Sequence, residues 1–169
     1  MTRPDSTEHA PYFGKYIALV PDGDIVPTLG KQIEETLGLL GGLSEAQGDL
    51  RYAPGKWSVK EVIGHLIDAE RIFAYRALRF ARNDQTPLAG FDENSYAANS
   101  NFGARSLADL AGEFKCVRES NIYLFKHLDG DAWSRRGVSN QNEISVRALA
   151  WVTAGHELHH REIIRSRYL

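Results

Sequence analysis

The sequence predicts an all-α protein, a four-helix bundle with a long crossover loop between the second and third helices. Apolar residues recur every three or four positions along four long segments, which is the spacing of an amphipathic helix. Capping and breaking residues bound these segments, and no strand-rich half is visible. Because 169 residues is a usual length for one domain, we expect a single bundle domain over 1–169.

The N-terminal segment and the first helix differ in residue pattern. Residues 1–21 hold many aromatic and aliphatic side chains without a helical period, so we expect an irregular segment that packs on the bundle. Asp22 or Asp24 can cap the first helix, because a carboxylate there accepts a hydrogen bond from a free backbone N–H group. Gly41-Gly42 ends this helix.

The second helix and the loop after it have clear boundaries. Ser58 and Glu61 have the spacing of a capping box, and the apolar pattern then continues to about Asn83. Residues 84–105 are rich in the Pro, Gly, Asn and Ser that are typical of a loop. A loop of this length often forms a lid or a binding wall, but it could equally just bridge two parallel helices. Both interpretations stay open at this point.

Serine residues also mark the start of the last two helices. Ser106 is placed to cap the third helix, which Asp129-Gly130-Asp131 breaks. A polar connection containing Gly and Asn follows, and Ser145 then caps a fourth helix that runs to about Arg167.

Composition excludes several classes of partner. The formal net charge of −2 and the isoelectric point of about 6.3 argue against binding to nucleic acid or to an anionic membrane. Apolar runs fall short of the roughly 18 residues that a membrane span needs. The first residues lack the apolar stretch of a secretory signal, so the cytoplasm is the expected compartment. A single cysteine, Cys116, rules out an intramolecular disulfide.

Three histidines are the candidate metal ligands. His156 and His160 lie four residues apart, so a helix places both imidazoles on one face, one turn apart. His65 lies at the edge of the apolar stripe of the second helix and faces the bundle interior or a cleft. A third imidazole from a neighbouring helix would complete a three-ligand site with the open position that metal catalysis requires. Zinc is the expected divalent ion and nickel the alternative, although imidazole also suits copper and iron.

The competing interpretation is that these histidines belong to the core. A single histidine in an apolar stripe is more often a hydrogen-bonded core residue than a ligand. Two of them one turn apart would both need buried partners, and one metal ion would satisfy both. His159 flanks the same stripe. It could support a ligand imidazole from the second shell of the metal, replace His160 as a ligand, or point to solvent, and the supporting role is the one we expect.

The stretch His156-Glu157-Leu158-His159-His160 also matches the H-E-x-x-H pattern of zinc metalloproteases, in which the Glu is the general base. Such a protease needs a third ligand downstream, and Glu162, the only acidic residue there, lies on the wrong face of the helix. The protease is therefore the least favoured function, and we expect Glu157 to form a surface ion pair.

Three further residues lie near these histidines. Asp68, one turn beyond His65, could hydrogen-bond a ligand imidazole or accept a proton, but we prefer a solvated carboxylate on the helix face. Arg76 lies on the same side of the helix and could bind an anionic group of a substrate, although a pair with a carboxylate between helices is preferred. Trp57 is expected to fix the helix start without contacting a substrate.

A longer pattern joins these residues: Pro54-Gly55-Lys56-Trp57-Ser58-Val59-Lys60-Glu61-Val62-Ile63-Gly64-His65-Leu66 with Asp68 and Glu70, then Arg118, the turn from Leu128 to Trp133, and Gly155-His156-Glu157-Leu158-His159-His160. From about residue 25 to the end, this pattern resembles the DinB/YfiT-like superfamily. The resemblance implies an up-up-down-down-like bundle. It also implies a metal held by one histidine of the second helix and an H-x-x-x-H pair of the fourth, positions that match His65, His156 and His160.

The resemblance is less specific about activity, since the superfamily contains transferases that use bacillithiol or mycothiol, isomerases and hydrolase-like proteins. Three neutral imidazoles would leave a metal its full charge and an open position, where a bound water or thiol becomes a stronger nucleophile. We therefore expect a metal-dependent enzyme that acts on small electrophilic molecules, with thiol S-transfer placed before hydrolysis and a low-molecular-weight thiol as the candidate co-substrate. The alternative is a non-catalytic bundle whose metal is structural or whose site is vestigial. A homodimer is compatible with the resemblance, although no residue points to one.

Overall fold

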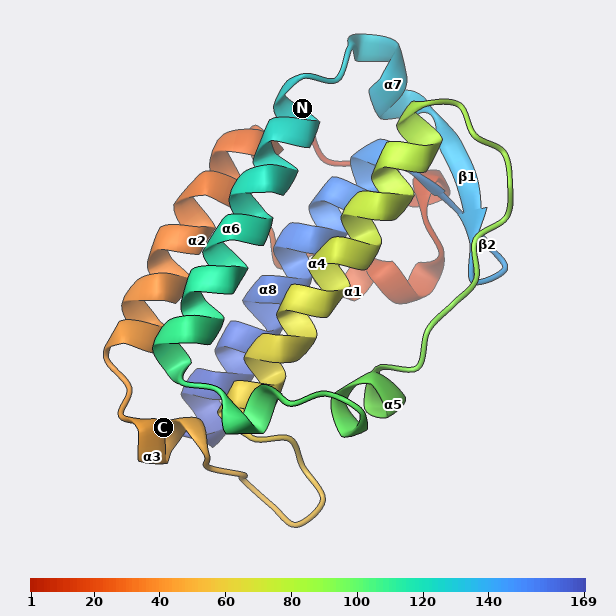
Figure 1. Ribbon diagram of the computed structural model, residues 1–169. Helices are drawn as coiled ribbons and strands as arrows, with labels where there is room; N and C mark the ends of the chain where they lie inside the picture. The colour runs from red at the N-terminus through yellow and green to blue at the C-terminus, as the bar shows by residue number, and fades with distance from the viewer.

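The computed structural model describes residues 1–169 and contains four long helices. They are α2 (Ile25–Gly41), α4 (Val59–Ala81), α6 (Leu107–Lys126) and α8 (Val146–Arg167), which form the bundle in Figure 1. Each begins directly after a residue whose side chain accepts a backbone hydrogen bond from the first turn; these residues are Asp24, Ser58, Ser106 and Ser145. The predicted all-α four-helix bundle is confirmed.

The four helices run as two parallel pairs. α4 and α6 begin at the same end of the bundle, where Glu45 of the short helix α3 (Glu45–Gly48) contacts both. Its carboxylate lies 2.8 Å from Lys60 Nζ and accepts a hydrogen bond of 2.9 Å from the backbone N–H of Leu107. α2 and α8 run the opposite way (Figure 1). The order along the chain is therefore down, up, up, down in that view, and the up-up-down-down order implied by the resemblance is wrong.

The apolar faces of the helices form two core clusters. One surrounds Trp151 and the other surrounds Phe114. A layer of buried charged side chains, centred on Arg118, lies between them at the middle of the bundle. None of the helices combines the length and the hydropathy that crossing a membrane requires.

The polar connection expected between α6 and α8 contains more regular structure than the sequence indicated. After the short helix α7 (Gly130–Ser134), strands β1 (Arg136–Ser139) and β2 (Asn142–Ser145) pair as an antiparallel hairpin. Its turn residues Asn140 and Gln141 have positive φ angles of 48° and 63°. An Asn-Gly pair is the usual sequence signal for such a turn, and Gln in the second position conceals it.

The crossover loop contains more regular structure than predicted. The short helix α5 (Glu93–Ala98) and a 3-10 turn (Phe102–Ala104) interrupt it. Leu88 donates a backbone hydrogen bond to Val138 and accepts one from Asn140, which fastens the start of the loop to the hairpin. The loop is needed because α4 and α6 are parallel, so the chain must return along the whole bundle between them (Figure 1).

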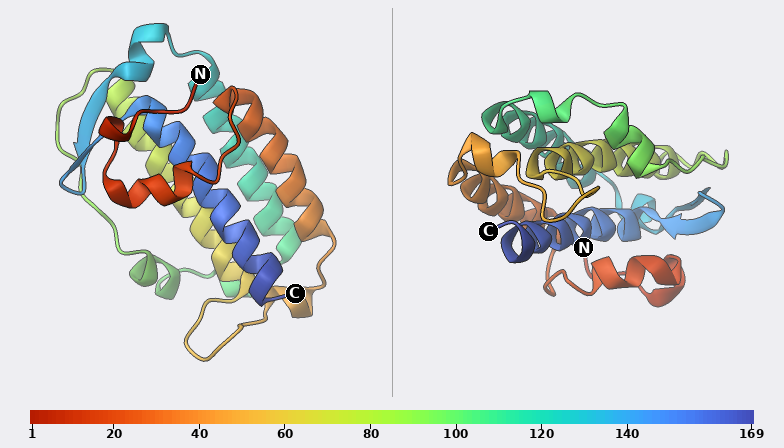
Figure 2. Two further views of the ribbon diagram at one scale, coloured as in Figure 1. Left: turned by 180° about the vertical axis from the view of Figure 1, so that it is seen from behind. Right: turned by 90° about the horizontal axis from the view of Figure 1, so that it is seen from below.

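The N-terminal segment lies against α8, on the side away from α6 (Figure 2). It is less irregular than expected, with two 3-10 turns (Ser6–Glu8 and Pro11–Phe13) and the short helix α1 (Gly14–Ile17). Gly155 of α8 allows this close approach, because a Cβ atom at that position would stand 2.1 Å from the carbonyl oxygen of Tyr16.

Candidate metal centre

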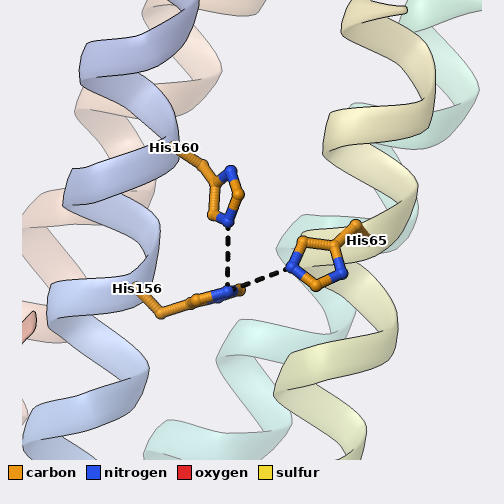
Figure 3. Close-up of side chains that lie close together, drawn as sticks. All are labelled: His65, His156 and His160. Carbon is orange, nitrogen blue, oxygen red and sulfur yellow. Dashed lines mark hydrogen bonds between the residues drawn. The ribbon is translucent and has the colours of Figure 1, made fainter. Parts of the chain in front are cut away.

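α4 and α8 bring three histidine side chains together (Figure 3). His65 lies in the second turn of α4, whose start is fixed by the capping box of Ser58 and Glu61. His156 and His160 project toward it from consecutive turns of α8. The Nε2 atom of His156 is 3.1 Å from that of His65 and 3.2 Å from that of His160.

The spacing of these nitrogen atoms suits a shared metal ion. Two imidazoles on a tetrahedral zinc ion, each about 2.0–2.1 Å from it, stand about 3.3 Å apart. The three ligand atoms all lie within 4.8 Å of one another, and no Cys, Asp or Glu side chain belongs to the group. The three side chains could therefore hold a divalent ion and leave it an open position.

Burial keeps the three imidazoles neutral. It lowers the pKa of His65 to about 4, although the nearby Glu93 acts in the opposite direction. Burial and then the neighbouring His65 and His159 lower the pKa of His160 to about 3. The pKa of His156 is also well below its ordinary value, again because of burial first. Neutral imidazole is the form that binds a metal ion, so the site is electrostatically prepared for one.

A cavity of about 630 Å³ opens onto the three histidines. Its walls come from parts of the chain that are far apart in sequence. The N-terminal segment contributes Tyr12 and Tyr16, the crossover loop contributes Phe91 and Glu93, and the hairpin contributes Asn140. The crossover loop thus forms a wall of the cavity as well as bridging two parallel helices.

Aromatic side chains surround the histidines, and Trp57 is among them. Its ring lies 4.9 Å from that of His65, measured between centroids, and it lines the cavity. Trp57, which was expected to fix the helix start, is therefore also part of the cavity wall. Tyr16 and Phe73 contact His156 edge-on, at centroid distances of 5.4 and 5.6 Å. Only the apolar character of residues 1–21 could have indicated Tyr16 in advance.

Two other candidate residues have different surroundings. His159 lines the cavity and is half-buried, with its ring 5.1 Å from His160 and 5.4 Å from Tyr16, but it donates no hydrogen bond to a candidate ligand. Asp68 is half-buried outside the cavity lining, where burial raises its pKa. The structure therefore gives Asp68 no place among the groups that face the histidines.

Arg76 lines the cavity but forms no pair with a carboxylate, so the preferred interpretation of this residue is wrong. Its side chain is buried, and its Nη2 donates a hydrogen bond of 3.1 Å to the carbonyl oxygen of Ala89 in the crossover loop. Burial lowers the pKa of its guanidinium.

Glu157 was expected at the surface and is instead completely buried. Its carboxylate accepts a hydrogen bond of 2.5 Å from the hydroxyl of Thr36. Its Oε2 lies 2.7 Å from Arg118 Nη2, an ion-pair contact without hydrogen-bond alignment. The expectation failed because α8 is covered on several sides, by α2, α4 and the N-terminal segment. Since Glu157 does not line the cavity, it cannot act there as the general base of a metalloprotease.

The fold and the three-histidine group define a helical bundle with a candidate metal site. The sequence model of the DinB superfamily matches residues 28–164, so the chain belongs to that superfamily and the resemblance seen in the sequence is confirmed. No curated protein sequence gives a significant match.

Two solved structures share the fold. YfiT from Bacillus subtilis, described as a probable metal-dependent hydrolase with an unusual four-helix bundle topology, aligns with a TM-score of 0.68 at 17% identity over 96% of this chain and 89% of its own. A mycothiol-dependent maleylpyruvate isomerase aligns with a TM-score of 0.67 at 13% identity over 81% of this chain. This chain covers 58% of the length of the isomerase.

Proposed function

We propose that this protein is a metal-dependent enzyme that acts on small electrophilic molecules, with one divalent ion held by His65, His156 and His160. The observation that carries the proposal is the position of these imidazoles at the base of an open cavity, with no fourth protein side chain in the group. A closed set of four protein ligands is typical of structural zinc, whereas three ligands and an open position are typical of catalytic zinc. Zinc is the proposed ion and nickel the alternative.

The surrounding side chains suit such chemistry. The rings of Trp57, Phe73 and Tyr16 lie against His65 or His156, and apolar surroundings of this kind strengthen electrostatic interactions inside a cavity. A bound zinc ion would supply Lewis acidity that makes a water molecule or a thiol a stronger nucleophile at neutral pH. The polar wall of the hairpin could orient a substrate.

Two nucleophiles are consistent with this centre. A thiol is supported by the fold shared with a mycothiol-dependent isomerase, and water by the fold shared with a probable metal-dependent hydrolase. The cavity of about 630 Å³ has room for a low-molecular-weight thiol beside a small electrophile. We therefore place thiol S-transfer before hydrolysis.

The test begins with protein purified without a histidine tag, whose metal content is measured by mass spectrometry. We expect about one zinc or nickel ion per chain, a content that His65→Ala abolishes. The exposed His127 is a matched control, and His127→Ala should keep the metal. If replacing His65, His156 or His160 by Ala left the metal content unchanged, the proposed site would be refuted.

Activity is then measured with two probes. Consumption of cysteine, as a model thiol, with a chlorodinitrobenzene electrophile reports thiol transfer, and cleavage of p-nitrophenyl acetate reports hydrolysis. Metal-dependent turnover of either probe above the His65→Ala background supports an enzyme and identifies the nucleophile. Metal that binds without turnover, and whose removal by a chelator unfolds the chain, would instead establish the non-catalytic structural site.

A further inference from the structure

Arg76 is a buried cation that no acidic group of the protein neutralises. The residue is 5% exposed and lines the cavity. The other three buried cationic residues each contact a carboxylate: they are Lys60, Arg118 and Arg161. No acidic side chain influences Arg76 in this way, since burial alone accounts for the lowered pKa of its guanidinium.

The one protein contact of this guanidinium does not require a charge. Nη2 donates to the carbonyl oxygen of Ala89 at 3.1 Å, which a neutral amide could do equally well. The remaining N–H groups of Arg76 donate to no protein acceptor. An unpaired guanidinium is unfavourable inside a protein, and its planar fork matches a carboxylate or a phosphate. The missing partner is therefore expected to come from outside the chain.

The position of Arg76 relates this missing partner to the histidines. Arg76 follows His65 by eleven residues on the same helix, a rise of about 16 Å along α4. Long side chains on a helix lean toward its start, so the guanidinium is expected on the order of 10 Å from the histidines, and both line the same cavity. Phe73 lines the cavity and contacts His156, which provides an apolar surface between the two ends.

We propose that the cavity binds small organic anions, with a carboxylate or phosphate group on Arg76 and an apolar body that extends along Phe73 toward the three histidines. The reacting group of the substrate would then lie at the histidines, at the end opposite the acidic group. This inference rests on the proposed function, because it identifies the class of molecule that the same cavity takes.

The experiment uses the full-length protein after removal of metal, so that the histidines cannot hold an acidic group through an ion. Binding of hexanoate, hexyl phosphate and the neutral hexanamide is measured by NMR titration. We expect at least one anion to bind about tenfold or more tightly than hexanamide, the effect of a charge-assisted hydrogen-bonded pair. Whichever of hexanoate and hexyl phosphate binds more tightly indicates whether the substrate carries a carboxylate or a phosphate.

The variant Arg76→Gln should remove the preference for the anion, because it removes the charge and keeps a polar, hydrogen-bonding side chain at this position. Arg82→Gln is the matched control, since Arg82 directly follows α4, is exposed and forms no ion pair; this variant should keep the preference. Arg76→Lys retains the charge and should keep part of the preference for the anion. This variant provides a second measurement if Arg76→Gln folds poorly.

Equal binding of anion and amide to the unaltered protein, or a preference that survives in Arg76→Gln, would overturn the inference. Metal content is measured on the same variants, and Arg76→Gln should hold as much metal as the unaltered protein. A protein that prefers anions but binds no metal would refute the proposed function and leave the anion site intact. A protein that binds metal and turns over the probes without preferring anions would refute the anion site and leave the proposed function intact.

Discussion

Replacing Arg118 by Met should strongly destabilise the bundle. The guanidinium is completely buried between two carboxylates, those of Glu70 and Glu157. It donates to the first from Nε and Nη2, and its Nη1 donates to the carbonyl oxygen of Leu29 at 3.1 Å. The contacts join α6 to the other three long helices.

The expected loss of unfolding free energy follows from the two carboxylates that the substitution leaves unpaired. Met fills a similar volume but leaves two buried carboxylates without a cation, and breaking a buried ion pair in this way costs about 3–5 kcal/mol of the free energy of unfolding. For a domain of this size, 1 kcal/mol corresponds to about 2–4 °C, so the melting temperature should fall by about 6–20 °C. Thermal unfolding followed by circular dichroism measures this change.

The pH dependence of the loss provides an internal check. Burial raises the pKa of Glu70 even while Arg118 opposes the shift. Without Arg118 the pKa should rise further, and a carboxyl whose pKa is higher in the folded state destabilises the fold increasingly as the pH rises above its unfolded value. The deficit of Arg118→Met should therefore be larger at pH 8 than at pH 5. A deficit below 1 kcal/mol, or one that is equal at both pH values, would refute this reasoning.

Three further changes test other parts of the molecule. Gly155→Ala should lower the free energy of unfolding by about 1–3 kcal/mol, because its Cβ would collide with the carbonyl oxygen of Tyr16; an unchanged urea midpoint would contradict the close contact. His160→Ala should abolish metal binding while the helical circular dichroism spectrum persists, since the bundle core is large; loss of the spectrum would indicate a structural metal. Glu8→Gln should lower the melting temperature at pH 7. Burial would raise the pKa of Glu8, but hydrogen bonds from Arg147 and other groups hold it below its ordinary value of 4.5. Its stabilisation is therefore fully present above the ordinary value and is lost as the pH falls through the lowered pKa, so the difference from the unaltered protein should shrink as the pH is lowered below 4.5. A difference that stays constant over that range would refute this reasoning.

The helices could be predicted because their signals are local. Ser58 with Glu61 sets the start of α4 whatever surrounds it, and a four-residue spacing fixes His156 and His160 on one face of any helix. The meeting of His65 with that pair required one more assumption, that α4 and α8 are neighbours. The resemblance to the DinB superfamily supplied that assumption where periodicity could not.

The walls of the cavity could not be predicted, because tertiary packing creates them. Tyr16 reaches His156 only because Gly155 lets the N-terminal segment approach α8. The hairpin that carries Asn140 was hidden by an atypical turn pair. A helical wheel placed Arg76 on the correct side of α4 but could not show that no carboxylate faces it.

The H-E-x-x-H stretch of α8 shows how one local pattern can serve two environments. Its first and last histidines face the cavity, while Glu157 turns into the buried charged layer beside Arg118. In a helix at a protein surface the glutamate would have been solvated, and in a metalloprotease it would face the metal. Here α8 packs against α2, α4 and the N-terminal segment, so side chains on different faces of the helix have different neighbours. Glu157, the residue that gives the stretch its resemblance to a metalloprotease, therefore belongs to the buried charged layer of the bundle. Any chemistry in the cavity must come from the residues that line it.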